Sequence, residues 1–375
     1  MTDQDWSTWA SVPWAPVTDS STATSSGNII GWHKQRVPYV PGDHCLSLQT
    51  LDVWIPASGS ETDSQIPPQT SDLPKLPGRW LVFIHGGAWR DPKVDSSSFS
   101  AAALKILSIV TTRIPKSGWT VPLAGMASLN YRLSPYPTHP EDPSPPSDPG
   151  ATPDPARQAK HPDHIQDVLT GIAFLQRLGG ALGSYLLAGH SCGATLAFQA
   201  VMNPTRWGLE NPPVIAKPSI LLGVNGLYDL AGFIAHPPRG YEHLRMAYDE
   251  FTRAAFGDDV RVWKAACPAT AEAWPKDWIE GKRLYLVDSE EDTLVPNDQI
   301  EALRKFLWAN SSLPIELRGA PGGHDEIWIK GDRLAELCLE AVGRLDLRQG
   351  IRVELLPEDD PYYAIGMSML TLTPM

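Results

Sequence analysis

In residues 184–201, SYLLAGHSCGATLAFQAV, an apolar strand-like run passes through a short turn directly into a helical pattern, which is typical of an α/β fold. The turn, GHSCG at residues 189–193, has the G-x-S-x-G spacing of a nucleophile elbow, which exposes the serine hydroxyl at the start of the helix. Glycines on both sides of the turn allow the strand and the helix to approach closely. Ser191 is therefore the candidate nucleophile, and the alternative is a serine that only caps a helix.

Strand-like runs recur on both sides of this segment, and helical patterns lie between most of them. The runs cover residues 46–55, 79–85, 123–133, 219–226, 282–289 and 314–319. The first run alternates like an edge strand, whereas the second is continuously apolar like a buried strand. Strands that alternate with helices predict an α/β fold with a mostly parallel, doubly wound sheet covered on both faces. We expect one such domain over residues 41–350.

Four segments fall outside this alternation. Residues 1–40 lack periodicity and predict an irregular N-terminal arm, and residues 351–375 form an unassigned C-terminal tail. Residues 134–162 are so rich in proline that we expect an exposed loop insert. Residues 230–268 have helical spacing between two strands, which predicts a small helical cap over the active site. The tryptophans of the arm could dock on the domain; they are Trp6, Trp9, Trp14 and Trp32.

Composition excludes several classes of function for this chain of 375 residues. Its net charge of -12 disfavours contact with nucleic acid, because phosphate backbones would be repelled. No apolar stretch approaches the roughly 20 residues that span a bilayer, so no membrane contact is expected. The N-terminus lacks a secretory pattern, which predicts a cytoplasmic location. The four scattered cysteines include no C-x-x-C pair, so neither disulfides nor a zinc knuckle is expected.

A second motif, HGGAW at residues 85–89, follows a buried strand upstream of the elbow. Such a loop supplies backbone amides to the oxyanion of a tetrahedral intermediate in esterases and lipases. We expect amides of Gly86 or Gly87 and of Ala88 to act together with the amide of Cys192. The alternative is a tight glycine turn that merely joins two elements.

An acidic loop and a histidine follow the serine in the order that α/β-hydrolases use. The loop DSEEDTLVP at residues 288–296 comes at a strand end, and GGHDEIW at residues 322–328 comes later. Asp292 is the expected acid and Asp288 the fallback. His324 is the expected base, because a loop histidine can reach across to a serine.

The remaining histidines compete with His324, and a surface position is preferred for each. They include His139, His161, His164, His236 and His243. The spacing of His161, His164 and Asp167 also suits zinc, but a helix that starts near Pro162 explains it without a metal ion. No cofactor or metal is expected, and we expect the Cys192 thiol to pack toward the body.

Several motifs stand out along the chain, namely HGGAW, NYRLSP, HPDHIQDV, GHSCGA, NGLYDL, EDTLVP and GGHDEIW. Together they resemble one family, the kynurenine formamidases of the α/β-hydrolase superfamily, with the fungal type closest. The similarity runs from about Leu81 to the terminal helix. It implies hydrolysis of N-formyl-L-kynurenine to L-kynurenine and formate in tryptophan catabolism, by a triad of Ser191, Asp292 and His324.

Substrate contacts follow from position around this implied site. Trp89 is a candidate for limiting the acyl side to a formyl group. Tyr228 and Asp229, at a strand end, are candidates for contact with the aromatic and ammonium groups of the substrate. Asp229 could instead cap the next helix. Two other functions remain as alternatives, a general short-acyl carboxylesterase and a non-catalytic ligand receptor on the same fold, and a homodimer is left open.

Overall fold

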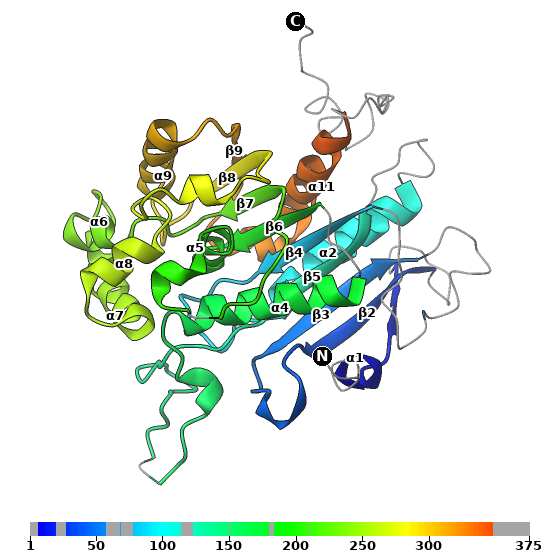
Figure 1. Ribbon diagram of the computed structural model, residues 1–375, viewed down its shortest axis with the longest axis horizontal. Coiled ribbons are helices and arrows are strands. Elements are labelled where there is room, and N and C mark those ends of the chain that lie inside the picture. Colours follow the sequence, from blue (N-terminus) through cyan, green and yellow to red (C-terminus); the bar gives the residue numbers. More distant parts are fainter. Residues whose placement is uncertain are drawn as a thin grey trace, which may run out of the picture.

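Across the described residues the chain forms a nine-stranded sheet with helices on both faces (Figure 1). The computed structural model describes residues 7–19, 28–57, 68, 78–113, 123–148, 150–179, 184–209 and 211–347. Trp6 and the predicted tail over residues 351–375 lie outside this range. The strand order is β1-β2-β3-β5-β4-β6-β7-β8-β9. From β5 to β9 in that order the neighbours are parallel, whereas β1, β2, β3 and β5 pair antiparallel.

The strands are β1 (Ala15–Thr18), β2 (Ile29–Pro38), β3 (Thr50–Pro56), β4 (Arg79–Ile84), β5 (Leu123–Leu129), β6 (Tyr185–His190), β7 (Ile220–Val224), β8 (Arg283–Ser289) and β9 (Ile315–Ala320). The α-helices are α1 (Ser7–Ser11), α2 (Ser100–Ser108), α4 (Asp163–Gly179), α5 (Cys192–Gln199), α6 (Leu230–Ala235), α7 (Arg245–Phe256), α8 (Val260–Ala266), α9 (Asp298–Asn310), α10 (Glu326–Lys330) and α11 (Asp332–Leu347). Short 3-10 turns cover Gly42–His44, Ser96–Phe99, Pro155–Arg157, Pro204–Trp207, Glu242–Leu244 and Trp274–Asp277, and Ile109–Arg113 is a π-helical turn.

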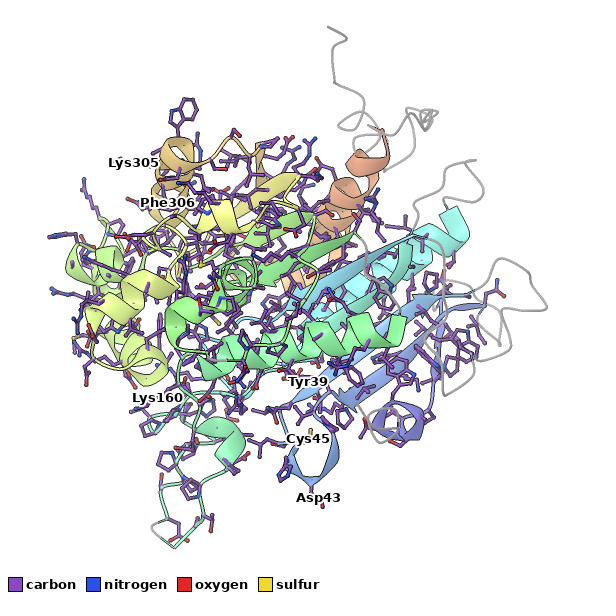
Figure 2. The ribbon with its side chains drawn as sticks, in the orientation of Figure 1. Tyr39, Asp43, Cys45, Lys160, Lys305 and Phe306 are labelled. Atoms are coloured by element: carbon purple, nitrogen blue, oxygen red, sulfur yellow. The ribbon has the colours of Figure 1, made fainter. Side chains whose placement is uncertain are left out.

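Strand β4 shows how helices cover both faces of the sheet. All six of its residues are buried, as its continuous apolar sequence predicts. Leu81 and Phe83 pack in one cluster with residues of α2 and α11, whereas Val82 and Ile84 pack in another with residues of α4, α5 and α9. The alternation follows from the two-residue period of a strand. Side chains fill the space between the layers in Figure 2, where the labelled Tyr39 is 1% exposed.

The N-terminal region differs from the predicted irregular arm, because β1 and β2 extend the sheet beyond β3. Strand β3 therefore lies between β2 and β5, and the prediction that this run is an edge strand is wrong. The expected docking of tryptophans is confirmed for Trp9, Trp14 and Trp32, which are buried. The Lys34 ammonium on β2 donates to Trp9 O at 2.8 Å and to Val12 O at 2.6 Å. Contacts between residues so far apart produce no periodic pattern in the sequence, so they could not be predicted from it.

The two inserts lie on either side of α4 and α5 in the chain. The proline-rich segment holds one 3-10 turn and is mostly exposed, although Ser134 and Ser144 are buried. The second insert contains α6, α7 and α8, which lie together at one side of the sheet in Figure 1. Among the described residues, none of the helices combines the length and the apolar character that crossing a bilayer requires.

Candidate active site

Ser191 lies in the turn between β6 and α5, and its backbone has the strained conformation of a nucleophile elbow. Its φ of 54° and ψ of -122° are strained for a residue with a side chain. A Cβ at Gly189 would lie 2.2 Å from Gly193 O, and one at Gly193 would lie 2.3 Å from His85 O. Both glycines of the motif are therefore required for the strand, the helix and the end of β4 to pack together. The same packing places Ser191 on the wall of a cavity.

His324 and Asp292 form a buried pair, and His324 lines the same cavity as Ser191. His324 Nδ1 and Asp292 Oδ2 are 2.7 Å apart, and both side chains are less than a tenth exposed. The other carboxylate oxygen, Oδ1, accepts the amides of Leu294 and Val295 at 2.8 Å each. A carboxylate held in this way fixes the proton on Nδ1, which leaves Nε2 as the basic nitrogen. The fallback Asp288 instead accepts from Asn297 Nδ2 at 2.8 Å.

The backbone of His324 is held by two side chains that the sequence did not single out. His190 Nε2 and Asn225 Nδ2 each donate to His324 O at 2.9 Å. Asn225 Nδ2 also donates to Ser289 Oγ at 2.9 Å, and Asn225 Oδ1 accepts the Ser289 amide at 2.9 Å. Asn225 thus joins the end of β7, the end of β8 and the histidine loop. Its φ of 47° is a conformation that asparagine tolerates better than most residues.

Ser191 and His324 both line a cavity of about 230 Å³. The second insert and the acid loop supply its apolar wall, from Leu244, Ala247, Tyr248, Phe251, Leu294 and Val295. Two tyrosines tie the insert to the acid loop: Tyr241 donates to Asp292 O at 2.5 Å and Tyr248 donates to Leu294 O at 2.8 Å. The insert therefore lines the cavity and is bonded to the acid loop.

The HGG loop presents the predicted oxyanion groups in part. Gly87 and Ala88 line the cavity, with φ of 91° and 48°. Cys192 is the first residue of α5, so its amide has no acceptor within the helix. Gly86 lies outside the cavity lining, and its carbonyl accepts from the Tyr131 hydroxyl at 3.0 Å. A Cβ on Gly86 would lie 2.9 Å from His190 Nδ1 and 3.1 Å from Ser191 Cβ, so a glycine is required beside the serine, and all four amides stay candidates for the oxyanion.

The Cys192 thiol packs into the body, as expected. Its Sγ accepts the Trp89 amide at 3.2 Å and lies 3.5 Å from the Tyr131 hydroxyl. Burial raises the pKa of this thiol to about 11. A protonated, inward-facing thiol does not compete with Ser191 as a nucleophile.

The three predicted substrate contacts do not line this cavity. Trp89 is fully buried and packs on Phe251 and Phe256, with ring centroids 6.1 and 5.0 Å apart. Its φ of 59° turns the side chain behind the wall rather than toward the acyl group. Tyr228 is also fully buried. Asp229 accepts the Gly232 amide at 2.8 Å, which confirms the alternative that it caps α6.

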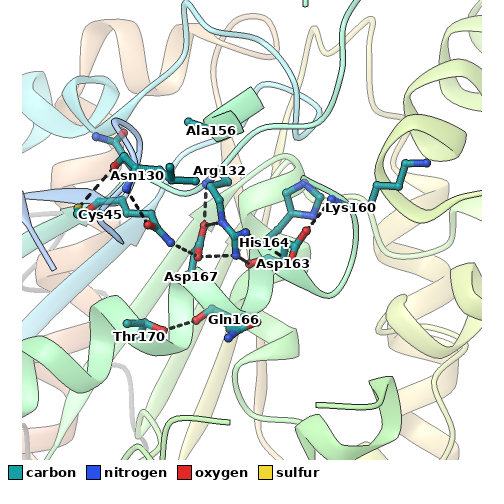
Figure 3. Close-up of polar contacts among 12 residues, drawn as sticks. Cys45, Asn130, Arg132, Ala156, Lys160, Asp163, His164, Gln166, Asp167 and Thr170 are labelled. Carbon is teal, nitrogen blue, oxygen red and sulfur yellow. Dashed lines mark hydrogen bonds and ion pairs between the residues drawn. The ribbon is translucent and has the colours of Figure 1, made fainter. Parts of the chain in front are cut away.

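The segment from His161 to Asp167, whose spacing suits zinc, contains the start of helix α4, and an ion pair holds it in place. Asp167 accepts from Arg132 Nε at 2.7 Å, from Arg132 Nη2 at 2.9 Å and from Gln49 Nε2 at 2.9 Å (Figure 3). His164 Nε2 contacts Ser134 Oγ at 2.9 Å. These contacts join α4 to the residues that follow β5. The Asp167 carboxylate is already paired with the Arg132 guanidinium, so it is not available to a metal ion.

The expected surface positions of the other histidines are confirmed for His236 and His243, which are exposed. The expectation is wrong for His139 and His164, which are buried. His161 is partly exposed as a residue, but both of its ring nitrogens are buried. The proline-rich segment folds back against α4 and α7, which covers these side chains; the His161 amide, for example, donates to Ala255 O at 2.6 Å.

One group of potential metal ligands lies at the site, where His190, His324 and Asp325 offer atoms within 4.8 Å of one another. Each of the three also has a hydrogen-bond partner. His190 contacts His324 O, His324 contacts Asp292, and Asp325 Oδ1 accepts from Trp328 Nε1 at 2.9 Å. These contacts account for all three side chains as the base and its surroundings, and metal dependence is tested with a chelator below.

Three buried histidines, together with His161, whose ring nitrogens are buried, predict that the fold loses stability in acid. Burial lowers the pKa of His85 to about 4 and the pKa of both His161 and His190 to about 3, and it holds the pKa of His164 well below its usual value. The unfolded chain takes up these protons near pH 6.5, whereas the folded chain does not. Each histidine therefore contributes stability above that pH, which is lost as pH falls toward the folded pKa, at about 1.4 kcal/mol per pH unit.

Urea unfolding between pH 7 and pH 5 measures this loss. His161 is the sharpest position, because its ring lies against Trp207 and Phe256 and neither ring nitrogen has a partner within the described part of the chain. His161→Phe should flatten the pH dependence by about 1.4 kcal/mol per pH unit. The exposed His243 changed to Gln should not flatten it. If the free energy of unfolding of His161→Phe depended on pH as strongly as that of the parent, the prediction that His161 is neutral and buried in the folded chain would be wrong.

Comparison with curated proteins finds relatives over most of the chain. A kynurenine formamidase-like hydrolase of Fusarium equiseti is 36% identical over 311 residues, which covers 82% of this chain and 93% of that protein. A kynurenine formamidase of Aspergillus versicolor is 33% identical, covering 78% of this chain and 95% of the relative. A kynurenine formamidase of Meyerozyma guilliermondii is 30% identical, covering 70% and 84%. No family model matches the chain.

Solved structures confirm the predicted fold class. Esterase B of Lactobacillus rhamnosis has a TM-score of 0.58 at 14% identity, covering 88% of this chain and 91% of that one. A propionate-bound esterase of Thermogutta terrifontis has a TM-score of 0.51 at 18% identity, covering 85% and 96%. The chain has the α/β-hydrolase fold that these esterases share. With that fold, the buried His-Asp pair and relatives of such identity and coverage, the chain belongs to the kynurenine formamidase family.

Proposed function

We propose that this protein hydrolyses the formamide of N-formyl-L-kynurenine to L-kynurenine and formate. The observation that carries the proposal is one cavity lined by Ser191 and by His324, whose Nδ1 lies 2.7 Å from Asp292. The names of the relatives support this substrate, because two of them are kynurenine formamidases at 33% and 30% identity. The apolar wall from Tyr248 and Phe251 suits the aromatic ring of such a substrate.

The reaction uses both ring nitrogens of His324. Nε2 takes the proton of the Ser191 hydroxyl as Oγ forms a bond to the formyl carbon. The carbonyl oxygen gains the negative charge and accepts hydrogen bonds from amides of the HGG loop and from the Cys192 amide. Asp292, hydrogen-bonded to Nδ1, stabilises the imidazolium.

Collapse of this intermediate breaks the carbon–nitrogen bond. His324 gives its proton to the leaving arylamine, which departs as L-kynurenine and leaves a formyl ester on Ser191. Water then gives a proton to His324 and attacks the ester carbon. The second collapse returns the proton to Ser191 Oγ and releases formate.

A general short-acyl carboxylesterase would use the same side chains, so the two functions are separated by comparing the rates on two substrates. Purified protein should release kynurenine and formate in equal amounts from N-formyl-L-kynurenine, with a kcat/KM at least about tenfold above that for p-nitrophenyl acetate. EDTA should leave this rate unchanged, because no step uses a metal ion. A faster reaction on the ester, or loss of the formamidase rate in EDTA, would overturn the proposal.

A cytoplasmic location, a homodimer, and the lack of nucleic-acid and membrane partners stay predictions from the sequence.

A further inference from the structure

Arg90 is a buried cation on the wall of the catalytic cavity. It follows the HGGAW motif directly and is 6% exposed. Its guanidinium lies 3.8 Å from the ring centroid of Tyr136, which also lines the cavity. Nη1 donates to Glu250 Oε1 on α7 at 3.0 Å. Stacking on Tyr136 therefore sets the orientation of this charge, with one ion pair beside it.

Most of the hydrogen-bonding capacity of Arg90 is still open. A guanidinium carries five N–H donors in a planar fork. Within the described residues, Glu250 is the hydrogen-bond acceptor of this side chain, and its carboxylate is 46% exposed and also accepts from Thr138 Oγ1 at 2.9 Å. An ion pair with a carboxylate so open to water holds the charge only weakly. A planar anion that enters the cavity could therefore pair with the remaining donors.

The other charges of the cavity narrow the class of ligand. Asp91 and Asp325 line it together with Arg90. A ligand with negative charge alone would meet these carboxylates, whereas a ligand that carries both an ammonium and a carboxylate suits such a mixed wall. An α-amino acid group has this pair of charges on one carbon atom.

We propose that Arg90 binds the carboxylate of the substrate's amino acid group and so selects N-formylated arylamines that carry a zwitterionic side chain. This inference rests on the proposed function. Arg90 then acts as a specificity residue, apart from the groups that touch the reacting formyl carbon. Tyr228 and Asp229 were expected at the aromatic and ammonium groups, and the sequence singled out no residue for the carboxylate.

A purely structural role for Arg90 makes a different prediction. Through Glu250 it joins the HGG loop to α7, so its removal could loosen the cavity wall. Loosening of the wall would lower the rate on every substrate alike. Recognition of a carboxylate lowers it only for substrates that carry one.

The test compares N-formyl-L-kynurenine with its carboxamide, which keeps the formanilide and the ammonium but lacks the carboxylate. The wild type should prefer the carboxylate by about ten- to a hundredfold in kcat/KM, the range expected for a charge-assisted hydrogen bond. Arg90→Gln should reduce this preference to less than about threefold, and Arg90→Lys should keep part of it. Glu250→Gln, which breaks the ion pair but keeps Arg90, should keep the full preference.

The matched control is Arg253→Gln on α7, where Arg253 pairs with Asp249 at 2.7 Å outside the cavity lining. It should leave the preference as in the wild type. An unchanged preference in Arg90→Gln, or a wild type that hydrolyses both substrates equally well, would overturn the role of Arg90. A wild type that releases no formate from either compound would instead overturn the proposed function.

Discussion

Ser191→Ala is expected to lower kcat for N-formyl-L-kynurenine by at least about 10⁴-fold, because it removes the atom that attacks the formyl carbon. Folding should be retained. Alanine can occupy the same strained backbone at φ 54°, and no hydrogen bond of the Ser191 side chain contributes to the cap of α5. Formate release and the urea midpoint, measured on the same preparation, separate the loss of chemistry from the loss of fold.

Ser128→Ala is the matched control for this substitution. Ser128 is a fully buried serine on β5 whose hydroxyl has no hydrogen-bond partner among the described residues. Its loss should leave kcat within about twofold of the wild type, as for most changes away from an active site. Near wild-type turnover in Ser191→Ala would contradict the assignment of the nucleophile.

Asp292→Asn is expected to lower kcat by about 10³- to 10⁴-fold, although the side chains differ by one atom. Asparagine Oδ1 can still accept the amides of Leu294 and Val295. Its amide nitrogen then faces His324 Nδ1 as a donor. The imidazole must move its proton to Nε2 in order to accept, and in that tautomer it cannot take the proton of Ser191.

Asp288→Asn separates this effect from a general change of charge in the acidic loop. Asp288 contacts Asn297 rather than His324, so its replacement should leave kcat within about twofold of the wild type. A steady-state comparison of the two variants tests the pairing directly. A larger loss in Asp288→Asn than in Asp292→Asn would show that the wrong carboxylate has been assigned.

The parts of the site that could be predicted from the sequence are those for which chemistry restricts the residue type and its local setting. A nucleophile elbow needs a strand, two glycines and a helix in direct succession, and residues 184–201 contain all of them. Continuous apolar runs likewise predicted β4, β6, β7 and β8 to within two residues. The run from residue 123 ends early, at Leu129, and the side chain of the next residue, Asn130, bonds Ser96 and Thr50.

Features that depend on contacts between distant segments were missed. Trp89 follows the oxyanion loop in sequence, but its positive φ directs the ring behind the cavity wall. Strand β2 has a mixed burial pattern and is recognised only by its pairing with β3. Asn225 and His190 hold the carbonyl of His324 across more than 90 residues of chain, a relation that no local pattern encodes.

Covalent labelling by an aryl phosphonate tests whether Ser191 is the activated nucleophile, because only a serine activated by the buried His-Asp pair should attack phosphorus quickly. We expect one phosphonyl group per chain, located on the peptide that contains Ser191, and loss of formamidase activity in parallel with labelling. The Asp292→Asn variant should label far more slowly, and Ser191→Ala should not label at all. A chain that keeps full formamidase activity with Ser191 blocked, or that loses activity with the label on another residue, would contradict the account.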